Sequence, residues 1–265
     1  MIHIKNEKEI AIMAKGGKIL SDVLFKVLAY AQPGVSEIEL DKLAEELIRK
    51  KGGEPGFKKV SGYNHTICIS TNNVVVHGIP TIYRLKPGDV VGIDCGVYLN
   101  GFHTDMSETK IIQNSKFPSA RAQGEDKIQN EGKQTFLDVG KRALEEAIRQ
   151  AKIGNRIGHI SKTIQDIVEK KHGYGVVRSL VGHGVGRQLH EEPEVPGFLT
   201  GAIEKTPRLV EGMVIAIEII YNMGKPDVVY SKKDDWTILS ADGSVSGLFE
   251  RTVAITSKGP VVLTS

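Results

Sequence analysis

Residues 87–94 read PGDVVGID, and residues 211–218 read EGMVIAIE. Each segment has a glycine suited to a turn, continues as a mostly apolar run typical of a buried strand, and ends on an acid. A second pair of similar segments is HGIP (77–80) and HGVG (183–186). Each of them precedes the strand segment of its own half. Segments that recur in the same order predict that the chain consists of two related halves.

Helical segments repeat as well. Residues 31–53 and 151–173 align at a constant spacing of 120, which pairs Gly53 with Gly173. Both segments carry apolar residues at helical spacing, so each is predicted to be an amphipathic helix. The two halves therefore share an order of helix followed by strands.

Another helix is predicted before each copy, over about 7–31 and about 135–151. Ser36 and Glu39 form a capping-box pattern at the start of the first copy. The fold class expected is α/β (α+β), with two halves related by a pseudo-twofold axis and packed as one domain, 1–265. The predicted limits are 1–112 and 134–265 for the halves and 113–133 for a polar connecting insertion.

The composition is that of an ordinary globular protein. The chain has 265 residues, of which 40% are hydrophobic, so it has enough apolar side chains for a core and is not intrinsically disordered. Its 35 Lys and Arg nearly balance its 32 Asp and Glu, which argues against a dedicated nucleic-acid binder. The longest apolar stretch, 213–221, is too short to cross a bilayer, and no signal-peptide pattern is present. We therefore expect a cytoplasmic protein with no membrane and no specific nucleic-acid partner.

Two acids stand in strands that are predicted to be buried. Asp94 ends the first of the matching segments, and Glu218 ends the second. A lone ionised carboxylate is costly in such a place, so each acid needs a partner or a metal ion. A salt bridge in the core is the simpler alternative.

The turn that follows Asp94 favours the metal ion. Asn100-Gly101 is typical of a two-residue hairpin turn, and this turn places Gly96 opposite Asp105. Asp94 and Asp105 then share one face of the sheet as diagonal neighbours, about 7–8 Å apart at Cα. Two acids beside a position without a side chain suit a cation better than a hydrophobic core.

The second half supplies matching acids. Glu218 occupies the repeat position of Asp94, and Glu250, in a strand predicted over 249–255, is expected at the repeat position of Asp105. Four carboxylates that face one another repel strongly without cations. Two divalent metal ions are therefore predicted.

Three of the eight histidines lie near these acids in the repeat. His183 is framed by glycines in GHGVG, His190 precedes Glu-Glu-Pro, and His77 precedes Gly-Ile-Pro. A single histidine is more often a surface or core residue than a ligand, so the setting singles these three out.

Several segments together resemble the type I methionine aminopeptidases, over nearly the whole chain and in the order of that family. They are VVVHGIP (74–80), GIDCGVYLNGFHTD (92–105), GHGVGRQLHEEP (182–193), AIEII (216–220) and the strand with Glu250. The resemblance implies the pita-bread fold, a single α/β domain with two pseudo-symmetric halves, which agrees with the internal repeat.

The resemblance also implies a set of metal ligands. They are Asp94, Asp105, His183, Glu218 and Glu250. Asp105 and Glu250 would bridge two divalent ions, and His183 would bind one of them. This ligand set does not select among Co, Mn, Fe, Zn and Ni, because all of them accept mixed oxygen and nitrogen ligands.

The implied activity is metal-dependent removal of the N-terminal methionine from nascent proteins and peptides, with a small second residue preferred. A metal-activated hydroxide attacks the first peptide bond. Glu218 relays a proton, His190 stabilises the tetrahedral oxyanion, and His77 contacts the peptide nitrogen. The implied partners are nascent polypeptide N-termini and the ribosome, and the expected oligomeric state is a monomer.

A methionine pocket is implied as well. Its residues, beside His77 and His190, are Phe57, Tyr63, Cys68, Leu189 and Trp236. The chain departs from the family pattern at three pocket positions: Leu189 replaces a common aromatic residue, Val60 a tyrosine and Phe57 a cysteine. Arg251 also stands where a histidine is common. Core packing is the alternative for the apolar members.

Other pita-bread proteins are the rival interpretations. Prolidase and X-Pro aminopeptidase share the fold and the ligands but normally carry an additional N-terminal domain. Type II methionine aminopeptidases carry a long helical insertion between the positions of His190 and Glu218, where this chain has 27 residues. A non-catalytic peptide-binding module typically lacks some of the ligands, all of which are present here. These comparisons favour type I.

Overall fold

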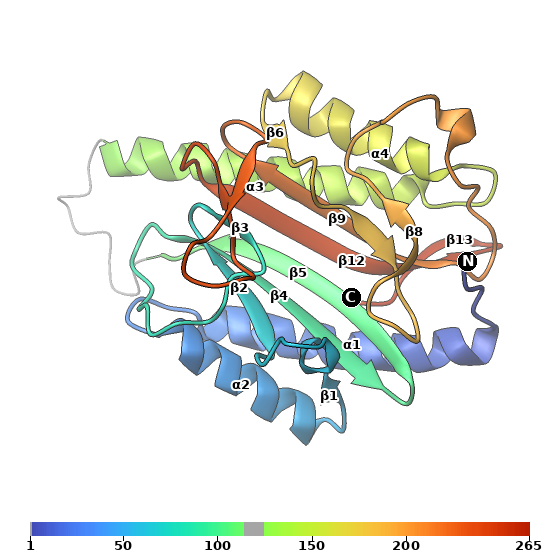
Figure 1. Ribbon diagram of the computed structural model, residues 1–265, viewed down its shortest axis with the longest axis horizontal. Helices are drawn as coiled ribbons and strands as arrows, with labels where there is room; N and C mark the ends of the chain where they lie inside the picture. The colour runs from blue at the N-terminus through green and yellow to red at the C-terminus, as the bar shows by residue number, and fades with distance from the viewer. Residues whose placement is uncertain (1, 114–124) are drawn as a thin grey trace.

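A ten-stranded antiparallel sheet lies at the centre of the protein (Figure 1). The computed structural model describes residues 2–113 and 125–265. The strands of this sheet are β1 (Glu54–Pro55), β2 (Ile67–Thr71), β4 (Val90–Leu99), β5 (Phe102–Ile111), β6 (Gly175–Val176), β7 (Gly182–Gly184), β8 (Glu191–Val195), β9 (Val214–Asn222), β12 (Ser246–Thr256) and β13 (Gly259–Val262). Its main path runs β1-β4-β5-β12-β9-β7-β8, so strands of the two halves meet between β5 and β12.

The helices of the first half are α1 (Glu7–Tyr30) and α2 (Glu37–Lys50). α1 packs on β4 and β5, and α2 packs on α1. The predicted capping box is confirmed, because the Ser36 side chain accepts the Glu39 N–H and the Glu39 carboxylate accepts the Ser36 N–H. Apolar side chains of both helices join those of β4 in one buried cluster, as their helical spacing predicts.

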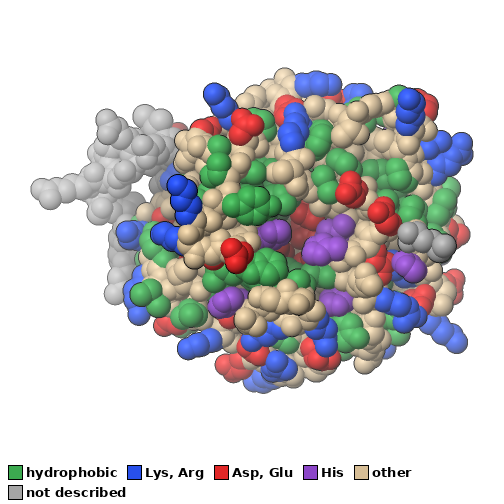
Figure 2. Space-filling view, in the orientation of Figure 1, with side chains coloured by type: hydrophobic (Ala, Val, Ile, Leu, Met, Phe, Trp, Pro, Cys, Tyr) green, Lys and Arg blue, Asp and Glu red, His purple; other side chains and the backbone are tan. Residues whose placement is uncertain are grey.

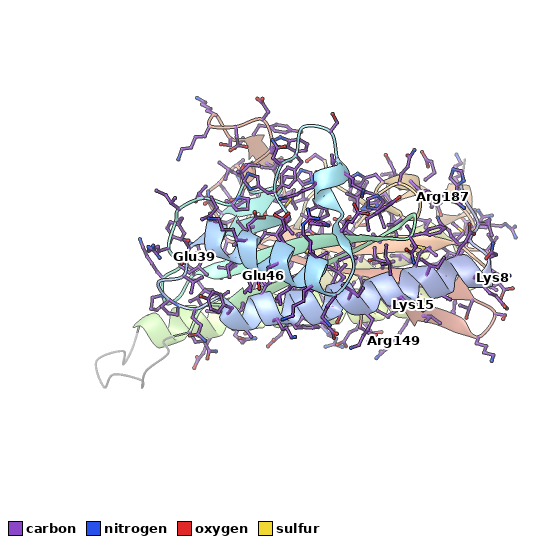
Figure 3. All side chains as sticks on the ribbon, turned by 90° about the horizontal axis from the view of Figure 1, so that it is seen from below. Lys8, Lys15, Glu39, Glu46, Arg149 and Arg187 are labelled. Atoms are coloured by element: carbon purple, nitrogen blue, oxygen red, sulfur yellow. The ribbon has the colours of Figure 1, made fainter. Side chains whose placement is uncertain are left out.

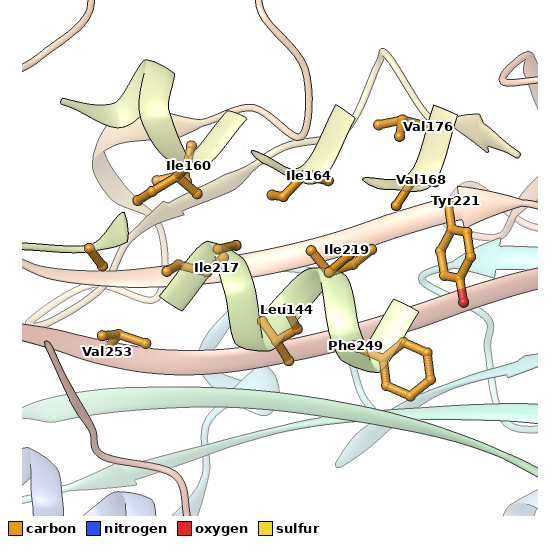
Figure 4. Packing of buried hydrophobic residues seen from close by; sticks show 14 of the residues in the cluster. Leu144, Ile160, Ile164, Val168, Val176, Ile217, Ile219, Tyr221, Phe249 and Val253 are labelled. Atoms are coloured by element: carbon orange, nitrogen blue, oxygen red, sulfur yellow. The ribbon is translucent and has the colours of Figure 1, made fainter. Parts of the chain in front are cut away.

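The helices of the second half are α3 (Glu125–Gln150) and α4 (Ile157–Gln165), and a π-helical turn, η2 (Asp166–Lys171), continues α4. Figure 4 shows their apolar side chains packed against those of β9 and β12. α3 begins earlier than the predicted residue 135, inside the insertion predicted over 113–133. Most of the remaining insertion, 114–124, lies outside the described residues.

The π-helical turn explains a shift in the internal repeat. The N-caps Ser36 and Arg156 are 120 residues apart, as the alignment predicts. After the helices, however, left-handed glycines follow at Gly52 (φ 82°) and Gly173 (φ 73°), which are 121 apart. A π-helical turn adds one residue to a helix, so the extra residue lies in η2. The pairing of Gly53 with Gly173 was therefore wrong by one position.

Two threonines mark the pseudo-twofold axis at the seam between the halves. The Thr252 hydroxyl bonds both backbone groups of Asp105, accepting its N–H at 2.9 Å and donating to its carbonyl at 2.8 Å. The Thr109 hydroxyl makes the same pair of bonds with Leu248, at 3.0 and 2.6 Å. Asp105 and Leu248 are thus equivalent positions of the two halves.

This symmetry corrects two equivalences expected from the sequence. Asp94 pairs with Ser107 and Glu218 pairs with Glu250, so Glu250 stands at the repeat position of Ser107 and not of Asp105. His183 pairs with Ala216, where the first half pairs Ser70 with Gly92. The repeat partner of His183 is therefore Ser70 and not His77. The errors arose because short motifs were matched without their strand register.

A small second sheet was not predicted. It consists of β3 (Val74–Val76), β10 (Val228–Tyr230) and β11 (Ile238–Ser240), in the order β10-β11-β3. Its strands come from both halves of the chain. β3 ends just before His77, and β11 begins shortly after Trp236. Short 3-10 helices lie at η1 (Phe57–Lys59) and η3 (Ile203–Lys205).

Seen from the edge, the helices lie on one side of the large sheet (Figure 3). Lys15 and Glu46, labelled in Figure 3, belong to α1 and α2 on that side. Among residues 2–113 and 125–265, no helix combines the length and the apolar character needed to cross a membrane. The other side of the sheet carries the candidate site.

Candidate metal centre and substrate cavity

Five consecutive strands of the sheet path each contribute one of the predicted metal ligands. The ligands are Asp94 on β4, Asp105 on β5, Glu250 on β12, Glu218 on β9 and His183 on β7. His183 Nε2 lies 3.4 Å from Glu218 Oε1 and 4.0 Å from Asp105 Oδ2. Side-chain atoms of Asp105, His183 and Glu250 all lie within 4.8 Å of one another. The fold therefore gathers residues that are far apart in the sequence.

The hairpin register agrees with the one predicted from Asn100-Gly101. Gly96 pairs with Asp105 and Asp94 pairs with Ser107, which makes the two acids diagonal neighbours on one face. The acids of the second half are instead directly opposite each other, because Glu218 pairs with Glu250.

Burial strongly raises the pKa values of the four acids. Burial raises the pKa of Asp94 to about 7. Burial also raises the pKa of Asp105, Glu218 and Glu250 well above the ordinary range, and repulsion between neighbouring carboxylates adds to it in each case. Clustered acids of this kind cannot all ionise unless positive charge is supplied.

The remaining ligand, His183, is neutral. Burial lowers its pKa to about 3, and repulsion from His190 contributes. Its Nδ1 lies 2.8 Å from the Gly184 carbonyl oxygen, which leaves Nε2 directed at the carboxylates. A neutral imidazole held by its other nitrogen is the form that binds metals.

A divalent cation fits this site. Asp94 Oδ1 and Glu250 Oε1 are buried and lack a hydrogen-bond partner within the described part of the chain. Buried polar atoms are almost always paired, and a cation would satisfy both oxygens and stabilise the ionised acids. One imidazole with four carboxylates is a mixed ligand set that suits transition metals.

A cavity of about 180 Å³ opens next to the acids. Figure 2 shows histidine side chains around a central hollow, with acidic side chains inside it. All the residues expected to contact substrate line this cavity: Phe57, Tyr63, Cys68, His77, Leu189, His190 and Trp236. Val60 lines it too, whereas the Arg251 side chain bonds Glu108 and the Ser107 and Glu250 carbonyls.

Some lining residues were missed. They are Val76, Leu180, Val181 and Ile220. Ile220 lies two residues beyond Glu218 on β9, so strand alternation places it on the same face and was a usable signal. Leu180 and Val181 lie just before β7 and carried no comparable pattern.

Aromatic rings form one wall of the cavity. The Tyr63 ring lies edge-on to Trp236 and Phe57, with centroids at 5.0 and 6.3 Å. The Tyr63 hydroxyl donates to the Ile67 carbonyl at 2.8 Å, which fixes the ring. Phe57, Tyr63, Cys68 and Leu189 form one buried apolar cluster against which Trp236 packs, and such a wall suits an apolar side chain.

Two further histidines, His77 and His190, line the cavity together with the apolar wall and the acids. The His190 ring lies 4.4 Å from the His183 ring, and burial lowers the His190 pKa. Burial, with repulsion from His190, lowers the His77 pKa to about 4. His77 also has a φ of 55°, which is uncommon for a residue other than glycine and is typical of functional sites. Both side chains are therefore neutral hydrogen-bonding groups at neutral pH.

Comparison with known proteins identifies the family of this chain. Residues 11–257 match metallopeptidase family M24. The chain is 44% identical to the methionine aminopeptidase of Clostridium perfringens, over 100% of this chain and 99% of that protein. It is 39% identical to methionine aminopeptidase 1 of Bacillus subtilis over the same shares. The chain belongs to the methionine aminopeptidases of metallopeptidase family M24.

Solved structures place the fold in the same family. The methionine aminopeptidase of Thermotoga maritima has a TM-score of 0.90 and 35% identity, with all of both chains covered. A prolidase from Pyrococcus furiosus has a TM-score of 0.72 and 25% identity, and the match covers 99% of this chain but 65% of that one. The pita-bread fold is thus confirmed, and the full-length matches are with methionine aminopeptidases. Members of family M24 are metallopeptidases, so divalent metal use follows.

Proposed function

We propose that this enzyme removes the N-terminal methionine from nascent proteins and peptides, with two divalent ions held by Asp94, Asp105, His183, Glu218 and Glu250. The observation that supports this proposal best is that the five residues and the apolar wall line one and the same cavity. The cavity accepts one apolar side chain, while the acids beside it suit the free amine and the scissile bond of a chain's first residue.

When bound, the ions would lower the pKa of a water molecule to near neutrality and polarise the substrate carbonyl. Asp105 and Glu250, which come from the two strands that meet at the seam, would bridge them. Because Asp105 and Glu250 would be shared and Asp94, His183 and Glu218 would not, this ligand set supports two metal ions per chain. The metal is one of Co, Mn, Fe, Zn or Ni.

The side chains around the scissile bond have separate tasks in this proposal. Glu218, ionised once positive charge is bound beside it, would accept a proton from the attacking water and pass it to the leaving amine. His190 donates a hydrogen bond to the tetrahedral oxyanion. His77, which lines the same cavity, contacts the peptide nitrogen.

The apolar wall sets the substrate preference. Phe57, Tyr63, Cys68, Leu189 and Trp236 enclose the methionine side chain. The second substrate residue lies near His77 and His190, where we expect a small side chain to be preferred. We also propose that the enzyme acts in the cytoplasm, as a monomer, on chains that emerge from the ribosome.

The test is an assay of metal-reconstituted enzyme on Met-Ala-Ser, on a peptide that starts with Leu-Ala and on an X-Pro peptide. We expect release of methionine from the first and little cleavage of the other two. Glu218→Gln should lower kcat by about 10²-fold or more, in line with the loss of a general base. Cleavage of the X-Pro peptide without release of methionine would instead assign a prolidase-like activity. Calorimetric titration with Co, Mn, Fe, Zn or Ni should reach two ions per chain.

A further inference from the structure

Lys5 and Glu191 form the most buried ion pair between a lysine or arginine and a carboxylate among residues 2–113 and 125–265. Lys5 Nζ lies 2.6 Å from Glu191 Oε2, and both side chains are 4% exposed. Two buried charges add little net stability, but removal of one partner leaves the other uncompensated. We therefore ask which part of the chain this ion pair holds in position.

Glu191 closes the loop that carries two residues of the cavity. It follows His190 directly, and its Oε1 accepts the Gln188 N–H at 3.1 Å. The pair also lies against Gly186: a Cβ added there would stand 2.8 Å from both Glu191 Oε1 and Lys5 Nζ. The loop 186–191, which includes Leu189, is thus folded around the carboxylate of Glu191.

Lys5 joins this loop to the base of a ligand-bearing strand. Its backbone N–H donates to the Gly212 carbonyl at 2.8 Å, just before β9. Gly212 has a φ of 83°, and a Cβ there would stand 2.6 Å from the Lys5 carbonyl oxygen. The chain before α1 is therefore fitted closely between β9 and the loop 186–191.

We propose that Lys5 is a positioning residue that acts through Glu191 to hold His190 and Leu189 at the cavity. The proposal rests on the function proposed above for His190. Without the Lys5 ammonium, the Glu191 carboxylate would turn towards water and draw the loop with it. His190 would then lie away from the oxyanion.

The first test is a double-mutant cycle on Lys5→Met and His190→Ala with Met-Ala-Ser as substrate. We expect Lys5→Met to lower kcat about 10- to 100-fold, the effect of a misplacement of about 1 Å. In the His190→Ala background the same change should cost less than about threefold, since the group it positions is gone. An equal loss of kcat in both backgrounds would overturn the proposal.

Two variants serve as controls. Lys8→Met removes an exposed lysine at the start of α1, labelled in Figure 3, and should leave kcat unchanged. Lys5→Arg keeps the charge and should restore most of kcat. If Lys5→Met does not fold, Glu191→Gln weakens the same contact and takes its place in the cycle, with the same outcomes.

Amide hydrogen exchange separates failure of this proposal from failure of the proposed function. If His190→Ala keeps the wild-type kcat, the proposed role of His190 is wrong, and the exchange data decide the role of Lys5. We expect the amides of Gln188 and Leu189 to exchange at least about tenfold faster in Lys5→Met, because an anchor of the loop is lost. Unchanged exchange would show that Lys5 does not position the loop.

Discussion

Single residues set the shape of the cavity, and Gly96 does so by lacking a side chain. It pairs with Asp105 on the hairpin, and the Phe57 ring lies directly over it. A Cβ at position 96 would stand 2.8 Å from Phe57 Cε1 and 2.9 Å from Cδ1. The glycine thus lets the Phe57 ring form part of the cavity wall next to Asp105, a proposed metal ligand on the paired strand.

Gly96→Ala should therefore push the Phe57 ring into the cavity. We expect kcat/KM for Met-Ala-Ser to fall about tenfold, mainly through KM, and the free energy of unfolding to fall by about 1–3 kcal/mol from overpacking. Steady-state kinetics and urea denaturation measure the two effects. Gly132→Ala, at an exposed helical position with open space around it, should leave KM unchanged and raise the free energy of unfolding by about 0.5–1 kcal/mol, the usual gain from alanine in a helix. A wild-type KM for Gly96→Ala would remove Phe57 from the methionine site.

Among the elements, the contact of β5 with β12 determines how the two halves of the ligand set meet. Its strand pairing comprises Glu250 with Ser107 and Arg251 with Met106. Thr109 and Thr252 extend it with hydroxyl bonds to the backbone of the opposite half. Thr252 bonds the backbone of Asp105, a proposed bridging ligand. Its symmetry equivalent, Thr109, bonds the backbone of Leu248, which is not a proposed ligand.

The pair Thr252→Val and Thr109→Val tests that difference. Each change leaves a buried N–H and a buried carbonyl unpaired, so each should lower the free energy of unfolding by about 1–3 kcal/mol. Only Thr252→Val should weaken metal binding, by about tenfold, because only it frees Asp105. Thermal denaturation and metal titration of both variants check the two statements. Equal metal affinity in the two variants would show that the seam does not position Asp105.

Local patterns predicted the elements that depend on neighbouring residues. Asn100-Gly101 was sufficient for the register of β4 with β5, and Ser36 with Glu39 for the start of α2. Contacts between distant segments were not predictable in this way. The placement of Glu250 opposite Glu218 depends on the pairing of β9 with β12, which no tight turn fixes.

For the site, too, sequence motifs were predictive and contacts between distant segments were not. The resemblance to a family supplied the five proposed ligands and the proposed pocket residues, and these residues line one cavity in the structure. Lys5 had no signal, because its partner Glu191 lies 186 residues away. The small sheet of β3, β10 and β11 was missed for the same reason, since its strands are short and come from both halves.

For the whole molecule, the buried carboxylates couple metal binding to stability. Their folded-state pKa values lie above the unfolded values, so the native protein binds more protons than the unfolded chain near neutral pH. Stability from these groups is present at low pH and is lost as the pH rises through the folded pKa, about 7 for Asp94. His77 and His183 have the opposite sign, with pKa values lowered to about 4 and about 3. Their contribution is complete above about pH 6.5, the unfolded pKa of histidine.

Above pH 6.5 the change of stability with pH is therefore set by the buried acids and not by these histidines. Enzyme freed of metal by a chelator should lose thermal stability as the pH rises from 6.5 to 8, and saturating divalent metal should abolish that loss, because metal takes the place of protons on the carboxylates. With free metal at about 100 times the Kd of a site, each bound ion should raise the melting temperature at pH 7.5 by about 5–10 °C. The rise should be smaller at pH 5.5, where protons already stabilise the cluster. Glu250→Gln removes one acid and should flatten the slope of the metal-free protein. A melting temperature that is independent of pH without metal would show that the carboxylates are not the groups whose charge the metal balances.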